Sequence, residues 1–121
     1  MIYLDSAATS FLKPPGVKAA MMQAMNTMSS PGRGAYNAAM LAADKVYECR
    51  ELACRLFNFN KPERVVFTLN ATHALNIAIK SLARRETRVV ISGYEHNSVT
   101  RPLHDISADV SVAAGELFDP D

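Results

Sequence analysis

The chain has 121 residues, 49% of them hydrophobic, which is enough for one ordinary globular domain with a buried core. Its 13 basic and 12 acidic residues give a formal net charge of +1 and are scattered, which argues against a clustered basic face for nucleic acid or a membrane surface. No apolar run approaches the roughly 20 residues of a membrane span, and the N-terminus lacks the pattern of a signal peptide, so we expect a cytoplasmic protein.

Two helices are predicted in the first half of the chain. Apolar residues recur at three- and four-residue steps over residues 17–28, after two prolines that a first helical turn tolerates. We interpret the methionine stripe of this helix as core packing. A break rich in serine, proline and glycine follows at residues 29–34. A longer amphipathic helix is predicted at residues 36–57, with charged residues along its solvent-exposed face.

Strands and helices alternate in the second half of the chain. Strands are predicted at residues 65–68, 88–92 and 110–113, and helices at residues 71–83 and 99–106. The continuous apolar centre of the second strand is typical of a strand that is buried on both faces. This alternation predicts right-handed crossovers and a parallel sheet, and therefore an α/β fold.

The cysteines and histidines do not form a recognisable metal site. Cys49 and Cys54 lie five residues apart in a predicted helix, a spacing that suits neither a disulfide nor a CxxC metal pair. We interpret them as reduced, half-buried packing residues, with a reactive thiol as the alternative. His73, His96 and His104 have no metal-ligand spacing among themselves, so no metal is expected.

The first candidate site is the turn at residues 69–72, between the first predicted strand and the following helix. A helix N-terminus presents unpaired N–H groups and a positive dipole end, which suit a phosphate, and Thr72 adds a hydroxyl. The same residues also suit a plain capping turn with asparagine or threonine as N-cap. The turn contains no glycine, so a dinucleotide site is not predicted, and a P-loop pattern is absent.

The second candidate site is the loop at residues 93–97. Ligands bind beyond the carboxyl ends of parallel strands, and this loop follows the second predicted strand. His96 stands there between a carboxylate and an amide, as a candidate for ring stacking or proton transfer, or as an ordinary surface histidine. Arg33, between two glycines, lies either in a helix–helix connection or in a flexible loop that carries its guanidinium to an anionic substrate.

Several short motifs follow one another along the chain. They are Tyr3-Leu4-Asp5-Ser6-Ala7-Ala8-Thr9-Ser10, Lys13-Pro14-Pro15, Pro31-Gly32-Arg33-Gly34, Asn70-Ala71-Thr72-His73-Ala74-Leu75-Asn76, Glu95-His96-Asn97-Ser98-Val99 and Arg101-Pro102-Leu103. In this order and at this spacing the chain resembles the N-terminal part of a cysteine desulfurase-like protein of the class V aminotransferase family, a group of pyridoxal-phosphate enzymes. Two departures are Ser6, where the family usually has asparagine, and Tyr36, near a position where relatives often carry histidine.

The resemblance implies an α/β fold, the N-terminal part of a fold-type-I transferase that depends on pyridoxal 5′-phosphate. Large-domain βαβ units with parallel strands would be preceded by two helices. Residues 1–35 would form the N-terminal segment and first helix of the small region, and residues 36–121 would begin the cofactor-binding large domain. The full-length protein is expected to be a homodimer that takes sulfur or selenium from cysteine or selenocysteine, leaves alanine, and has a sulfur-acceptor protein as a further partner.

The resemblance also assigns roles to single residues. Ala71 and Thr72 match the pair that binds the cofactor phosphate through backbone N–H groups and the threonine hydroxyl, and Asn70 belongs to the same cofactor-binding set. His96 matches the histidine that stacks on the pyridine ring and moves protons, so it is both a cofactor-binding and a catalytic residue.

Further roles concern the active-site mouth and a missing lysine. Ala7 and Ala8 match the segment that runs near the active site, and Arg33 matches a loop near the dimer interface and the active-site mouth. The family's Schiff-base lysine follows a Ser-x-His motif, which this chain lacks, so the chain alone is expected to be inactive. Two alternatives stay open: a class V enzyme that acts on another amino acid, and a truncated, non-catalytic interaction module.

Overall fold

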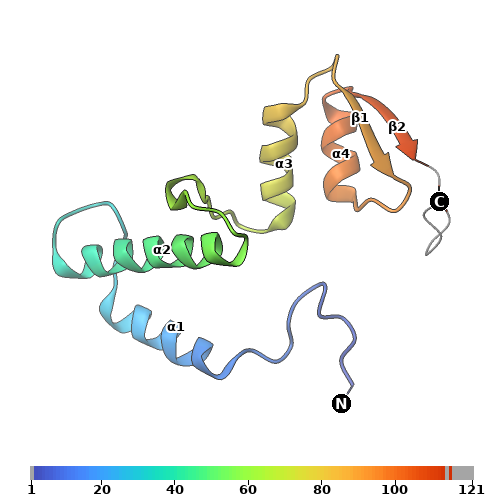
Figure 1. Ribbon diagram of the computed structural model, residues 1–121. Helices are drawn as coiled ribbons and strands as arrows, with labels where there is room; N and C mark the ends of the chain where they lie inside the picture. Colours follow the sequence, from blue (N-terminus) through green and yellow to red (C-terminus); the bar gives the residue numbers. More distant parts are fainter. Residues whose placement is uncertain (1, 114, 116–121) are drawn as a thin grey trace. The chain divides into compact units, whose positions relative to one another are not determined.

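The computed structural model describes residues 2–113 and residue 115 (Figure 1). The chain divides into two compact units, the first ending at Val66 and the second beginning at Phe67. The predicted boundary between residues 35 and 36 is a different kind of division, because it separates the domains expected of a full-length enzyme. That boundary stays a prediction. Among the described residues, no helix is both long enough and apolar enough to cross a membrane.

The first unit contains two α-helices, as predicted. Helix α1 spans Pro15–Thr27, helix α2 spans Asn37–Leu56, and a short 3-10 helix, η1, follows at Pro62–Arg64. Proline suits the start of α1 because the N–H groups of a first turn have no partner inside the helix. After α2, Asn58 takes a positive φ of 50°, a conformation that asparagine tolerates better than most residues.

The buried side chains of the first unit lie on α2. They are Ala39, Ala42 and Cys54. Helix α1 has no buried residue, and Met21 and Met25 are exposed, so the prediction that this stripe packs in a core is wrong in this structure. An amphipathic helix buries its apolar side only where another element covers it. Both cysteines are free thiols, as predicted, but neither is half-buried as expected, since Cys54 is buried and Cys49 is exposed.

The second unit alternates helices and strands. It contains α3 (Ala71–Leu82), β1 (Arg88–Ser92), α4 (Asn97–Asp105) and β2 (Asp109–Ala113). The two strands pair in parallel, from Arg88 opposite Asp109 to Ser92 opposite Ala113. Parallel neighbours need a crossover connection, which α4 provides, so β1, α4 and β2 form a βαβ unit. The predicted α/β class with parallel strands preceded by helices is confirmed.

The predicted strand at residues 65–68 is not a strand in this structure. Val65 has extended backbone angles, with φ −83° and ψ 119°, but the sheet of the described residues contains β1 and β2 and no third strand. Val66 and Phe67 are exposed. A β-branched and aromatic sequence favours a strand through its contacts with a neighbouring strand, so the segment remains extended without forming a ladder.

The sheet is covered on one face by α4. Val89 and Ile91 of β1 are half-buried, and Leu103 of α4 lines a shared cavity with Ile91 and Val110. Leu103 is itself 3% exposed, whereas Val90, on the opposite face of β1, is 72% exposed. The prediction that β1 is buried on both faces is therefore wrong for the described residues.

Candidate functional site

Asn70 starts α3. Its backbone is extended, its side-chain Oδ1 accepts the N–H of His73 at 2.9 Å, and its carbonyl accepts the N–H of Ala74 at 3.1 Å. The Thr68 hydroxyl donates to the same carbonyl at 2.9 Å. The bond to Oδ1 satisfies one of the four N–H groups that a first turn leaves unpaired, and the bond from Ala74 is the first regular bond of the helix. Asn70 is therefore an N-cap, one of the two readings that the sequence left open.

Two backbone N–H groups beside the cap are available to an anion. The N–H groups of Ala71 and Thr72 have no acceptor among the described residues, and both residues are exposed. The Thr72 hydroxyl likewise has no hydrogen-bond partner in the described part of the chain. Because the peptide dipoles of α3 place positive partial charge at this end, two N–H groups and one hydroxyl are a donor set that fits a phosphate.

His96 starts α4. Its ring Nδ1 accepts the N–H of Ser98 at 3.1 Å and lies 2.9 Å from the Ser98 hydroxyl. The helix therefore begins at Asn97, two residues before the predicted start, because the histidine itself provides the cap. His96 is exposed, whereas Ser98 is 7% exposed. No role was predicted for Ser98, although a serine two residues after the candidate histidine is a signal for such a contact.

The loop before His96 is fixed by hydrogen bonds of its own. The Ser92 hydroxyl donates to Oε1 of Glu95 at 2.8 Å. The Tyr94 hydroxyl donates to the carbonyl of Gly115 at 3.0 Å, so the loop after β1 is joined to the chain after β2. These contacts hold the peptide that leads into His96, and they were not predicted.

The first turn of α3 and the cap of α4 lie at the same end of the second unit. Helices α3 and α4 lie side by side and run in the same direction, and the carboxyl ends of β1 and β2 point to the end where both helices begin (Figure 1). Lys80 of α3 forms an ion pair with Asp105 of α4, 25 residues later. Ala71 and Thr72, in the first turn of α3, and His96, the cap of α4, therefore lie at the end of the second unit where both helices begin.

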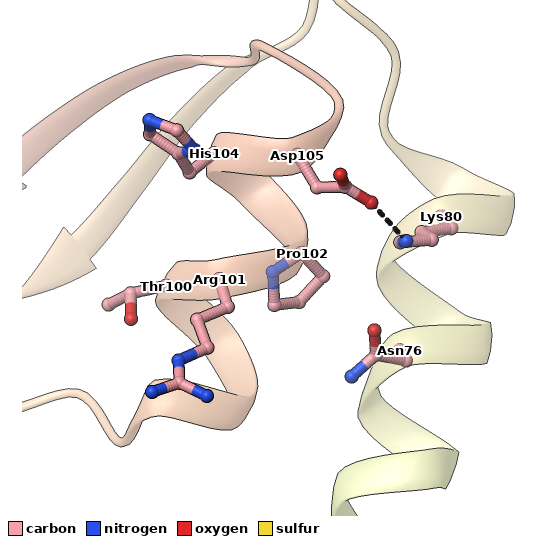
Figure 2. A pocket seen from close by; sticks show the side chains of 7 residues that line it. All are labelled: Asn76, Lys80, Thr100, Arg101, Pro102, His104 and Asp105. Atoms are coloured by element: carbon pink, nitrogen blue, oxygen red, sulfur yellow. Dashed lines mark hydrogen bonds and ion pairs between the residues drawn. The ribbon is translucent and has the colours of Figure 1, made fainter.

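A groove of about 490 Å³ lies between the same two helices, nearer to their C-terminal ends (Figure 2). Its lining is Asn76, Lys80, Thr100, Arg101, Pro102, His104 and Asp105. The hydrogen bond from Lys80, followed by its charge, lowers the pKa of Asp105 below the ordinary value of 3.8. None of the predicted site residues lines this groove. Among the described residues, no cluster of three or more His, Cys, Asp or Glu side chains suits a metal ion.

Ala7 and Ala8 lie in a turn of the first unit. The N–H of Ala8 donates to the carbonyl of Asp5 at 3.1 Å, and the Tyr3 hydroxyl closes the turn by donating to the carbonyl of Thr9 at 2.7 Å. Both alanines are exposed. Their place near an active site stays a prediction.

Arg33 lies in the loop between α1 and α2. Gly32 before it has a φ of +77°, which favours glycine, and a side chain at Gly34 would lie 2.9 Å from the ring of Tyr36. The hydroxyls of Ser29 and Tyr36 are 2.6 Å apart and join the two sides of the loop. Arg33 is exposed, and its role at a dimer interface or active-site mouth stays a prediction.

Comparisons with known proteins agree on one family. The sequence model of the aminotransferase class-V family matches residues 2–115. A probable cysteine desulfurase of Methanothermobacter thermautotrophicus is 33% identical over 98% of this chain and 31% of its own length. A probable cysteine desulfurase of Synechocystis is 29% identical over 89% of this chain and 27% of its own length.

Human selenocysteine lyase is a further relative, 26% identical over 87% of this chain and 28% of its own length. No solved structure matches the chain. The chain thus spans about three tenths of the length of the curated relatives that it matches. The match over nearly all of its described residues shows that the chain belongs to the class-V aminotransferase family, of fold type I.

Proposed function

We propose that this chain supplies the cofactor-phosphate turn and the ring-stacking histidine of a pyridoxal-phosphate-dependent cysteine desulfurase or selenocysteine lyase. Such an enzyme removes sulfur or selenium from cysteine or selenocysteine and leaves alanine. The observation that carries the proposal is the pair of free N–H groups, on Ala71 and Thr72, at the same end of the second unit as His96. The names of the relatives support the substrate class.

The phosphate would be held by the first turn of α3. The N–H groups of Ala71 and Thr72 and the Thr72 hydroxyl are three donors, and the positive end of the helix favours the anion. Asn70 contributes by taking up the N–H of His73, which fixes the turn so that the two earlier N–H groups remain for the ligand.

His96 would pack its flat ring against the cofactor. Bound pyridoxal phosphate supplies an electron-accepting pyridine ring, and aromatic rings prefer offset stacked arrangements. We also propose that Ala7, Ala8 and Arg33 lie near the active-site mouth of a homodimer. The planar fork of the Arg33 guanidinium is suited to a carboxylate such as that of the amino-acid substrate. A sulfur-acceptor protein would be a further partner.

Binding of pyridoxine 5′-phosphate to the 121-residue chain tests the phosphate turn. This compound carries the ring and the phosphate but no aldehyde, so it does not react with surface lysines. We expect titration calorimetry to detect it and to find weaker binding, by about tenfold, in Thr72→Val. Thr72→Ser, which restores the hydroxyl, and Ser81→Ala, at the far end of α3, serve as matched controls and keep the affinity. Equal binding of pyridoxine without phosphate would contradict the proposal.

The chain alone is proposed to lack turnover, because it has no Ser-x-His-Lys motif to provide the Schiff-base lysine. With added cofactor and either cysteine or selenocysteine, we expect neither alanine nor sulfide or selenide above the level of cofactor alone. Product formed by the pure 121-residue chain would refute this. The coding DNA after Asp121 tests the larger proposal: we expect an open frame with that motif, and a stop codon would favour a non-catalytic interaction module.

A further inference from the structure

The contact between His96 and Ser98 fixes more than a helix start. The Ser98 N–H donates to Nδ1 of the ring at 3.1 Å. A backbone N–H can only donate, so Nδ1 must offer its lone pair, and a neutral ring then carries its proton on Nε2. Ser98 is 7% exposed, so its N–H would have little water to replace this bond.

The Ser98 hydroxyl acts on the same ring nitrogen. Its oxygen lies 2.9 Å from Nδ1, and with Nδ1 as acceptor the hydroxyl is a donor. Two donors of one residue therefore converge on one nitrogen and favour one tautomer and one ring orientation. Nε2, on the other side of the ring, has no hydrogen-bond partner among the described residues, and His96 is exposed.

We propose that Ser98 is a positioning residue, which selects the Nε2–H tautomer of His96 and leaves Nε2–H as a hydrogen-bond donor toward a ligand group at the edge of the ring, beside the stacked face. The identity of that ligand rests on the proposed function, whereas the tautomer does not. In this state Nε2 has no lone pair in the ring plane, so His96 donates and does not accept a proton there. Accepting a proton requires Nδ1, which is engaged in the cap of α4.

Nitrogen NMR of the ligand-free 121-residue chain measures the tautomer directly. The chain is labelled with ¹⁵N-histidine and studied at about pH 8.5, well above the usual titration range of histidine, so that the rings are neutral. His73→Gln and His104→Gln assign the His96 signals by elimination. We expect a protonated Nε2 and an unprotonated Nδ1 at His96. A ring that is mainly protonated on Nδ1, or an equal mixture of tautomers, would overturn the proposal.

Substitutions of Ser98 separate positioning from a merely structural role. Ser98→Ala keeps the backbone N–H but loses the hydroxyl, and we expect the ratio of Nε2–H to Nδ1–H tautomer to fall about fivefold, as for loss of one neutral hydrogen bond. Ser98→Thr should restore the ratio, and Ser81→Ala should leave it unchanged. A purely structural serine would lower the melting temperature without moving the ratio, and that result refutes the positioning role.

The wild-type spectrum decides the tautomer even if the alanine variant fails to fold. No cofactor is present in these measurements. If the chain shows the Nε2–H tautomer but does not bind pyridoxine 5′-phosphate, the proposed function is rejected and this inference is kept. If the chain binds pyridoxine 5′-phosphate but shows another tautomer, this inference is rejected and the proposed function is kept.

Discussion

At the residue scale, Asn70 is the cap of the helix whose first turn is the proposed phosphate site. Its side chain closes the first turn of α3 by accepting the N–H of His73, while the N–H groups of Ala71 and Thr72 have no acceptor among the described residues. A capping side chain and a phosphate therefore do not compete here, because they use different N–H groups of the same turn. The two readings of the turn that the sequence allows are compatible.

Substitutions of Asn70 should separate stability from binding. Asn70→Ala removes the cap, and we expect the free energy of unfolding to fall by about 1 kcal/mol, measured by urea denaturation followed by circular dichroism. Asn70→Asp keeps a capping oxygen, so stability is retained, but its charge repels the phosphate. We expect calorimetry to show weaker binding of pyridoxine 5′-phosphate by about tenfold. An unchanged urea midpoint in Asn70→Ala would show that the cap contributes nothing.

The two caps differ in how far sequence predicts them. Asparagine is among the preferred N-cap residues, so the role of Asn70 follows from its position before a helical pattern. Histidine is not, and the cap at His96 depends on the ring turning back onto the N–H of Ser98, a contact between side chain and backbone that no residue pattern encodes. The predicted start of α4 was late by two residues for this reason.

At the scale of elements, α3 and α4 are joined by the ion pair between Lys80 and Asp105 (Figure 2). Both side chains are largely exposed, so the pair contributes little to stability. The ion pair affects the pKa of Asp105, which is lowered mainly by the hydrogen bond from Lys80. The pair lies at the end of the helices opposite to the first turn of α3.

This pKa gives a pH-dependent prediction. A carboxyl group with a lowered folded-state pKa stabilises the fold above its unfolded value, 3.8 for Asp105, and the effect is lost as pH falls through the folded-state pKa. The urea midpoint of Asp105→Asn should lie slightly below that of the wild type above about pH 5, and the two should converge below pH 3.8.

The salt dependence of the same variant is the second part of that test. High salt should shrink the difference between Asp105→Asn and the wild type, because it screens exposed charges. Glu86→Gln changes an exposed carboxylate that has no ion-pair partner among the described residues, and it is the matched control. If the urea midpoints of Asp105→Asn and the wild type differ as much at low pH as they do above about pH 5, the charge of Asp105 does not cause the difference in stability.

The local sequence pattern predicted the positions of the helices and strands of the second unit better than it predicted strand pairing and burial. Strand β1 lies at the predicted residues, and α3 begins at the predicted residue, because periodicity and the cap are properties of the local sequence. The segment at residues 65–68 has a strand-like sequence, but a strand also needs a partner, and the described sheet provides none. The exposure of Val90 has the same cause, since burial depends on what covers a face.

At the scale of the whole molecule, the described residues bury few apolar side chains. The buried hydrophobic residues are Ala39, Ala42, Cys54 and Leu103, which are small apart from the leucine. Leu82 and Val90 line one apolar cavity of the second unit and are 83% and 72% exposed. Among the described residues, the sheet has two strands, so each strand has an open edge, and open edges pair readily with other chains.

These features predict self-association of the 121-residue chain. Exposed apolar surface and free strand edges are stabilised by contact with a second copy, since burial of each large apolar side chain contributes roughly 1.5–3 kcal/mol. Sedimentation velocity at increasing concentration should show a mass above that of one chain. The double variant Leu82→Gln, Val90→Thr should weaken association by about tenfold while keeping a β-branched residue in β1.

Salt distinguishes the cause of the association. Contacts between apolar surfaces persist or strengthen in sulfate, whereas contacts between opposite charges weaken as ionic strength rises. With a formal net charge of only +1, the chain has little overall repulsion to keep copies apart. A monomer at every concentration, or an association that salt dissolves, would show that the open sheet face and edges are not what holds the copies together.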